Sequence, residues 1–214
     1  MDYKNTNTNR EGAMKTAADM SSLFERALRD ITRERTARWP VQFTDGAIRL
    51  ALANTLGVDR LAENTDKCVE AAMAAQRTRP WLLFTGGVGR GKTALMRVIL
   101  AAMGAHPSRP KQLYAPARDI ALDANIADRA RSVELLAVDD LGTEPAQVLI
   151  YGTPLNPLAA LIEHRYDRGL ATYITTNVPG KTLAEVYGTR VVSRIQEMAG
   201  VVHFDKYFSN TLRQ

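Results

Sequence analysis

A glycine-rich segment near the middle of the chain constrains its fold more than any other feature. Residues 86–93 read GGVGRGKT and match the pattern G-x-x-x-x-G-K-[ST] at every fixed position. The apolar run Trp81–Thr85 precedes this segment, and residues 93–103 have the apolar spacing of a helix. A strand, a loop and a helix in this order are the context in which the pattern binds phosphate. The segment therefore predicts an α/β domain that binds a nucleoside triphosphate.

The residues of this loop have distinct predicted roles. Lys92 is expected to reach the β- and γ-phosphates, and the hydroxyl of Thr93 is expected to ligate Mg²⁺. Glycines allow the backbone to turn tightly enough for its N–H groups to face the phosphates. The predicted nucleotide-binding residues are Gly86, Gly87, Val88, Gly89, Arg90, Gly91, Lys92, Thr93 and Ala94.

A second apolar run, Leu135–Asp139, ends in a carboxylate that Asp140 follows directly. Strands buried on both faces of a parallel sheet read as apolar runs, and their carboxyl ends lie at one edge. Asp139 is expected to bind Mg²⁺ directly or through water. Asp140 is expected to orient or deprotonate the attacking water. Because glutamate is the more usual residue at the second position, the shorter aspartate predicts slow hydrolysis.

A third run, Ala171–Thr176, is rich in β-branched residues and is followed by Asn177. Its carboxyl end should lie beside the ends of the other two strands. Asn177, or Thr176 in its place, is therefore predicted to contact the γ-phosphate and the lytic water.

Taken together, these motifs resemble those of the AAA+ ATPases of the DnaC, DnaI and IstB group. The resemblance extends from about residue 80 to 213, nearly two thirds of the chain. It implies a P-loop core with a five-stranded parallel sheet between helices and without a full lid. The matching stretches are 86–93, 135–144 (LLAVDDLGTE), 162–166 with Gly169, 175–177, 187–195 and 208–213.

The resemblance also assigns roles to three arginines. Arg194 corresponds to the arginine finger that reaches the ATP of a neighbouring subunit, with Arg190 as the alternative. Arg213 corresponds to the second sensor arginine of the same subunit. By spacing alone, arginines four residues apart on a helix more often form a solvated face or surface ion pairs.

The chain is predicted to have three parts: a disordered polar tail at 1–16, a helical partner-binding module at 17–79 and the AAA+ domain at 80–214. Residues 20–38 fit an amphipathic helix, whose apolar stripe includes Phe24 and Leu28. Two more helices are expected at 45–56 and 59–76. The remaining predicted elements are strands at 81–85, 112–115, 135–139, 171–176 and 201–204, and a helix at 157–168.

Composition excludes some classes of protein without selecting one. The net charge of +5 is compatible with nucleic acid binding but does not require it. Cys68 is the only cysteine, so an internal disulfide is excluded, and it is expected to be a small buried residue. No apolar run is long enough to span a bilayer and no signal core is present, so a cytoplasmic location without membrane contact is expected.

These features predict a DnaC-like helicase loader that binds ATP and Mg²⁺. Its expected partners are a DnaB-like replicative helicase, single-stranded DNA and further copies of itself, joined through the arginine finger. Two alternatives remain open from the sequence. One is an IstB-like transposition helper ATPase, and the other is an adaptor switched by ATP with little turnover.

Overall fold

A computed structural model describes residues 43–56, 63–106, 108–150 and 152–206 of the chain. The predicted tail at 1–16, the predicted helix at 20–38 and Arg213 lie outside these residues. None of the helices within the described ranges is both long and apolar enough to cross a membrane.

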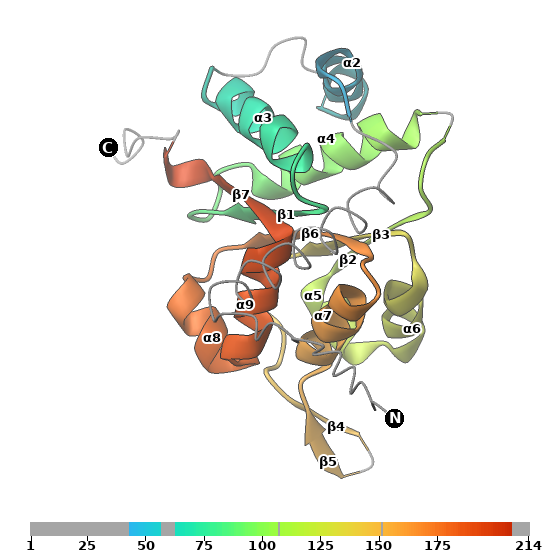
Figure 1. The fold of residues 1–214 in the computed structure, drawn as a ribbon, viewed down its shortest axis with the longest axis vertical. Coiled ribbons are helices and arrows are strands. Elements are labelled where there is room, and N and C mark those ends of the chain that lie inside the picture. The colour runs from blue at the N-terminus through green and yellow to red at the C-terminus, as the bar shows by residue number, and fades with distance from the viewer. Residues whose placement is uncertain (1–42, 57–62, 107, 151, 207–214) are drawn as a thin grey trace, which may run out of the picture. The chain divides into compact units, whose positions relative to one another are not determined.

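Five parallel strands form the central sheet (Figure 1). They are β1 (Trp81–Thr85), β2 (Gln112–Pro116), β3 (Leu135–Asp139), β6 (Ala171–Thr176) and β7 (Ala199–His203). The strand order is β2-β3-β6-β1-β7, so β6 lies between β1 and β3. Every residue of β3 and β6 is buried, which explains why both appear in the sequence as apolar or β-branched runs. The predicted parallel α/β sheet is confirmed.

Helices cover both faces of the sheet, and each face has its own apolar cluster (Figure 1). One face carries α2 (Asp45–Leu56), α3 (Glu63–Gln76) and α4 (Lys92–Gly104). The other carries α5 (Ala117–Leu122), α6 (Ala124–Ser132), α7 (Pro157–Asp167), α8 (Gly180–Tyr187) and α9 (Thr189–Met198).

The start of α7 shows how the sequence fixes a helix boundary. The side-chain oxygen of Asn156 accepts a hydrogen bond from the backbone N–H of Ala159 at 2.9 Å. Pro157 then occupies the first turn, where its fixed φ favours a helix and its missing N–H has no partner to lose. Together these residues end the preceding chain and set the direction of α7.

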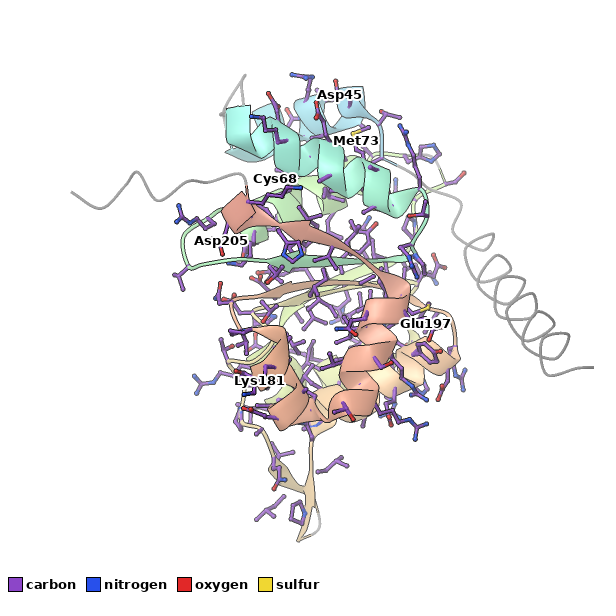
Figure 2. The ribbon with its side chains drawn as sticks, turned by 60° about the vertical axis from the view of Figure 1, so that its left-hand side comes forward. Asp45, Cys68, Met73, Lys181, Glu197 and Asp205 are labelled. Atoms are coloured by element: carbon purple, nitrogen blue, oxygen red, sulfur yellow. The ribbon has the colours of Figure 1, made fainter. Side chains whose placement is uncertain are left out.

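Helices α2 and α3 share one core with α4 and β1. The side chain of Gln76 in α3 donates a hydrogen bond to the hydroxyl of Tyr173 in β6 at 3.1 Å. A Cβ placed on Gly200 would lie 2.4 Å from the Cβ of Ala75, so glycine lets α3 approach β7 closely. Cys68 is buried in this layer, as predicted, and burial raises the pKa of its thiol to about 11 (Figure 2).

Two features of the chain between β3 and the C-terminus differ from expectation. The last strand is Ala199–His203, not 201–204, because its pairing with β1 begins at Ala199 opposite Trp81. Phe204 instead begins a short 3-10 helix, η1 (Phe204–Lys206). An unpredicted hairpin of β4 (Val148–Ile150) and β5 (Thr153–Leu155) extends away from the sheet in Figures 1 and 2.

Arg165 is fully buried on the face of the sheet that α7 covers. Its guanidinium donates to the hydroxyl of Thr172 at 2.9 Å, to the carbonyl oxygens of Ala130 at 2.7 Å and Val133 at 2.9 Å, and to that of Ala171. Burial lowers the pKa of this group to about 9, so it stays charged at neutral pH. The side chain thereby joins α6, α7 and β6 by hydrogen bonds, which satisfy its buried donors.

Candidate nucleotide-binding site

The phosphate loop connects the carboxyl end of β1 to the amino end of α4. Gly91 is the N-cap of α4 and has a φ of 88°, a conformation that residues with a side chain rarely adopt. The first N–H groups of a helix have no partner within the helix. The loop therefore presents backbone donors and the positive end of the helix dipole to the same hollow, as an anion-binding site requires.

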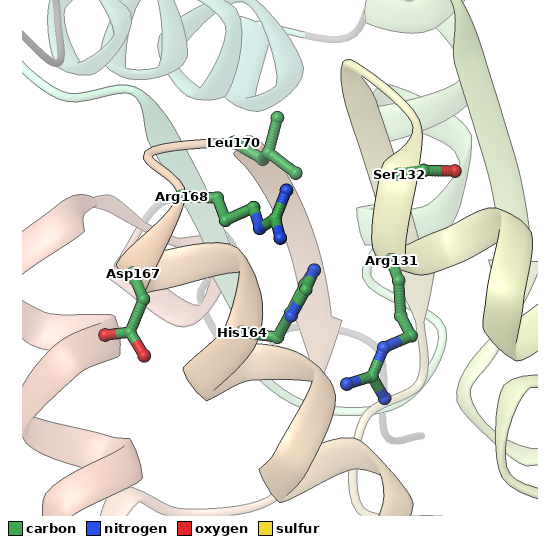
Figure 3. Close-up of a pocket in the computed structure, with 6 residues that line it drawn as sticks. All are labelled: Arg131, Ser132, His164, Asp167, Arg168 and Leu170. Carbon is green, nitrogen blue, oxygen red and sulfur yellow. The ribbon is translucent and has the colours of Figure 1, made fainter.

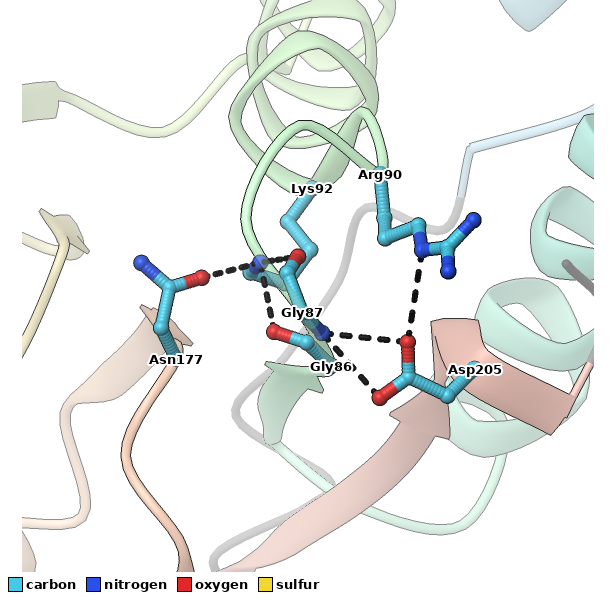
Figure 4. A network of polar contacts seen from close by, with 6 residues as sticks. All are labelled: Gly86, Gly87, Arg90, Lys92, Asn177 and Asp205. Atoms are coloured by element: carbon cyan, nitrogen blue, oxygen red, sulfur yellow. Dashed lines mark hydrogen bonds and ion pairs between the residues drawn. The ribbon is translucent and has the colours of Figure 1, made fainter. Parts of the chain in front are cut away.

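Lys92 extends into the loop and is buried. Its Nζ donates to the carbonyl oxygens of Gly86 at 2.8 Å and Gly87 at 2.7 Å, and to Oδ1 of Asn177 (Figure 4). Burial lowers the pKa of the ammonium, and the nearby Asp140 opposes this shift. The side chain of Lys92 thus connects the phosphate loop to the residue that follows β6. This contact is expected when the carboxyl ends of parallel strands lie at one edge of the sheet.

Asp139, at the end of β3, lies next to the first turn of α4. The hydroxyl of Thr93 donates to its Oδ1 at 2.8 Å, and the hydroxyl of Thr175 donates to the same oxygen at 2.6 Å. The hydroxyl of Tyr114 donates to its Oδ2 at 2.5 Å. The two residues predicted to hold the metal are therefore in direct contact.

This pair fits a magnesium ion that arrives with a triphosphate. Mg²⁺ is usually held by one or two carboxylates, several waters and the phosphates of the substrate. Thr93 and Asp139 supply one hydroxyl and one carboxylate at the mouth of the loop. Within the described residues, no three or more His, Cys, Asp and Glu side chains gather closely enough to hold a metal by themselves. A divalent ion at this position would take its remaining ligands from water and from the phosphate oxygens.

Asp140 has an unusual backbone conformation. Its φ of 54° is the one positive value among non-glycine residues in the described part of the chain. Aspartate tolerates this region better than most residues do, and such outliers concentrate at functional sites. Its backbone N–H donates to the hydroxyl of Thr175 at 2.8 Å, and Nδ2 of Asn177 donates to its Oδ1 at 3.4 Å.

Thr176, the last residue of β6, and Asn177, which follows it, make different contacts. The hydroxyl of Thr176 is buried and donates to the carbonyl oxygen of Leu141 at 2.7 Å. Asn177 instead contacts Lys92 and Asp140. Of the two residues predicted to contact the γ-phosphate, only Asn177 is directed toward the loop.

A hollow of about 520 Å³ lies over the phosphate loop. Residues 88–94, Asp140 and Asn177 line it, and all of them were predicted as site residues. Arg97 also lines the hollow, one turn after Thr93 on α4, and its role was not expected from the sequence. The hollow therefore brings together residues from all three of the separate motifs.

Asp205 contacts the phosphate loop from the side of β7, and no motif in the sequence predicted this contact. Its two carboxylate oxygens accept the backbone N–H of Gly87 at 3.1 and 3.0 Å, and one lies 3.5 Å from Nε of Arg90 (Figure 4). This contact arises because β7 pairs with β1 and η1 follows β7 directly. Only the strand order could have revealed it.

The two candidate finger arginines lie on α9 and contact carboxylates of α7. Arg194 approaches Glu163 at 3.5 Å and Asp167 at 3.4 Å, and its guanidinium lies 4.6 Å from the ring centre of Tyr166. Arg190 approaches Glu163 at 3.3 Å. The side chain of Arg194 is 13% exposed and that of Arg190 is 73% exposed. Neither lines the hollow over the phosphate loop, so within one chain both belong to a separate surface.

The loop after Asp140 is braced against α8 by Glu144. One carboxylate oxygen accepts the backbone N–H of Gly142 at 2.9 Å, and the other accepts the hydroxyl of Tyr187. Burial and this carboxylate raise the pKa of the Tyr187 phenol, which therefore remains a donor. These contacts connect the acidic end of β3 to the helix that precedes α9.

A second hollow lies at the amino ends of β3 and β6, the edge opposite to the phosphate loop. Arg131, His164 and Arg168 line it together with Asp167 (Figure 3). Burial and the two arginines lower the pKa of His164. Arg131 lies in the last turn of α6 and Arg168 is the C-cap of α7, so their positive charge complements the negative ends of those helix dipoles.

A phosphate loop after β1, two consecutive carboxylates at the end of β3, and β6 paired between these two strands define a P-loop core with the AAA+ fold. Solved structures share this fold. The DnaC helicase loader is 22% identical, with a TM-score of 0.55 over 69% of this chain and 93% of that chain. DnaI is 20% identical, with a TM-score of 0.53 over 75% of this chain and 93% of that chain.

Domain III of the Thermotoga maritima replication initiation protein DnaA is similar as well. It is 18% identical, with a TM-score of 0.52 over 76% of this chain and 68% of that chain. No family model matches the chain, and a search of curated proteins found no match. The predicted resemblance to DnaC and DnaI is thus confirmed at the level of the fold.

Proposed function

We propose that the chain binds ATP with Mg²⁺ over the phosphate loop and hydrolyses it slowly when its copies assemble. The observation that carries this proposal is that side chains connect the carboxyl ends of β1, β3 and β6. Thr93 contacts Asp139, and Lys92 contacts Asn177. Asn177 in turn contacts Asp140. A glycine-rich turn without a ligand would not require these contacts.

Each side chain has a task that its position supports. The amides of the loop and Lys92 bind the phosphates, and Thr93 and Asp139 hold the metal, which neutralises phosphate charge when it is bound. Asp140 accepts a proton from the attacking water or orients it, and Asn177 positions the same water. These are the roles that the sequence motifs predict for the five residues.

Full turnover requires a cation from outside the loop, because negative charge accumulates on the transferred phosphoryl group. We propose that Arg194 of one copy supplies it to the ATP of the next copy, with Arg190 as the alternative. Arg194 would have to leave Glu163 and Asp167 to do so, whereas Arg190 is already exposed. Assembly is therefore a condition for hydrolysis in this proposal.

We propose further that this ATPase acts in DNA replication as a helicase loader. The fold is shared with a structure described as the DnaC helicase loader over most of that chain. The proposed partners are a DnaB-like replicative helicase and single-stranded DNA, and the segment at 17–79 is proposed to select the helicase. Because the ATPase motifs are common to loaders and transposition helpers, they do not select the partner.

The partner is tested with the full-length chain, since α2 and α3 share a core with the sheet and cannot be removed cleanly. We expect the purified chain to bind a DnaB-like helicase, and Phe24→Asp with Leu28→Asp to weaken binding at least about tenfold. The unchanged ATP affinity of the double variant serves as the control for folding. Binding of a transposase instead of the helicase would replace this proposal with the IstB-like alternative.

One observation favours the ATP-switched adaptor as a second candidate. Asp140 is shorter than the usual glutamate, and its Oδ1 already accepts a hydrogen bond from Asn177. A single-turnover measurement with ATP, the helicase and single-stranded DNA distinguishes the two. Tight ATP binding without detectable product would support the adaptor, and product formation would support the ATPase.

A further inference from the structure

Both oxygens of the Asp139 carboxylate are engaged by hydroxyl donors from three different elements. Thr93 of α4 and Thr175 of β6 donate to Oδ1, at 2.8 and 2.6 Å. Tyr114 of β2 donates to Oδ2 at 2.5 Å. The hydroxyl of Tyr114 is therefore the single donor in the described structure that holds the second oxygen.

Arg97 fixes the direction of this hydrogen bond. Its Nη2 donates to the phenol oxygen of Tyr114 at 2.8 Å, and its guanidinium carbon lies 4.6 Å from the ring centre. A phenol has one hydrogen to donate. Because Arg97 occupies an acceptor position on the oxygen, that hydrogen is left for Asp139. Burial and the hydrogen bond to Asp139 raise the pKa of Tyr114, so the phenol is neutral at neutral pH.

The orientation of a carboxylate is otherwise weakly determined. The terminal torsion of aspartate has a broad energy minimum, so donors at one oxygen alone leave the plane of the group free to turn. A donor at Oδ2 removes that freedom. An ionised carboxylate oxygen can accept more than one hydrogen bond, so Oδ2 retains capacity for a metal or a metal-bound water.

We infer that Tyr114 is a positioning residue for the metal-binding carboxylate of Asp139, and that Arg97 orients the Tyr114 hydroxyl for this task. The inference rests on the proposed binding of Mg²⁺ and ATP. It assigns β2 a function in the site, although none of the motifs in the sequence involves that strand. Tyr114 touches neither nucleotide nor water in this account and acts only through Asp139.

Tyr114→Phe tests the inference, because it keeps the ring and removes only the hydroxyl. A fluorescent ATP analogue is titrated in EDTA and at a series of Mg²⁺ concentrations. We expect the Mg²⁺ concentration at half-maximal effect to rise about tenfold, the effect of one lost hydrogen bond to a charged group. Affinity in EDTA is expected to stay within about twofold, since the phosphate loop is intact.

Tyr166→Phe is a matched control, since it removes a hydroxyl that donates to the carboxylate of Glu197 at 2.7 Å, away from the loop. It should leave the Mg²⁺ requirement unchanged. Arg97→Gln should raise the requirement in the wild-type chain but not in the Tyr114→Phe background. Because Arg97 also lines the hollow, its effect is measured relative to affinity in EDTA.

The outcomes separate this inference from the proposed function. An unchanged or lowered Mg²⁺ requirement in Tyr114→Phe would overturn the positioning role. Equal weakening in EDTA and in Mg²⁺ would also overturn it, because a general structural defect would then explain the loss. Absence of ATP binding by the wild-type chain would contradict the proposed function itself.

Discussion

At the carboxyl edge of the sheet, polar side chains from separate elements contact one another directly, whereas on α9 the two candidate arginines contact side chains of α7, chiefly its carboxylates. Lys92 joins the loop to Asn177, and Thr93 joins α4 to Asp139. Arg190 and Arg194 share Glu163 instead. The contacts of the first region form within one chain. The arginines of the second region are paired with carboxylates of the same chain. Nucleotide binding and turnover should therefore be separable by mutation.

Lys92→Ala is expected to have the largest effect. It removes the loop's buried cation, so ATP affinity should fall at least about a hundredfold, as measured by calorimetry. Lys181→Ala provides a matched control, because Lys181 is an exposed lysine on α8 (Figure 2). Equal affinity of the Lys92 variant and the wild-type chain would place ATP somewhere other than the phosphate loop.

Asp140→Asn should lower the rate of ATP hydrolysis without changing ATP affinity. The substitution keeps the size of the side chain and removes its basicity, so turnover should fall about a hundredfold while ATP affinity stays within about twofold. Phosphate release reports the first quantity, and analogue binding reports the second. Asp139→Asn should instead raise the Mg²⁺ requirement. A turnover rate unaffected by Asp140→Asn would assign the base to another residue.

Substitutions on α9 should leave ATP binding intact. Arg194→Ala is expected to lower turnover of the assembled protein about tenfold or more, because the transferred phosphoryl group loses its external cation. Arg190→Ala should have the smaller effect, provided that light scattering shows both variants to assemble normally. The reverse order would move the finger to the more exposed Arg190.

Glu163→Gln should have the smallest effect. It weakens the ion pairs that hold both arginines of α9 against α7, and surface pairs of this kind contribute about 0–1 kcal/mol. Turnover is therefore expected to rise about twofold at low protein concentration, with ATP affinity unchanged. A decrease in turnover would indicate that the pairs orient the arginines instead of restraining them.

The strands of the first region could be predicted from the sequence because each depends on local chemistry. Strands 81–85, 135–139 and 171–176 coincide with β1, β3 and β6, since burial on both faces leaves apolar or β-branched runs. The parallel arrangement then brings their polar ends together at one edge. The phosphate loop needed only its glycines, Lys92 and the following helix to be identified.

Contacts made through strand pairing could not be predicted in this way. Tyr114 reads as an ordinary strand aromatic until β2 is placed beside β3. Asp205 approaches Gly87 only because β7 pairs with β1, and the predicted strand at 201–204 was displaced by two residues at its start. The ion pairs of α9 depend on α7 packing beside it. The bounds of the partner-binding segment and the roles of the arginines stay predictions.

The measurement that tests the central claim most directly is complementation between two inactive variants. Lys92→Ala is expected to lose ATP binding while it carries an intact Arg194, and Arg194→Ala is expected to bind ATP while it lacks the proposed cation. If one copy binds ATP and the next supplies the arginine, mixing the two should restore part of the wild-type turnover. No recovery in a mixture whose co-assembly is shown by light scattering would contradict the account.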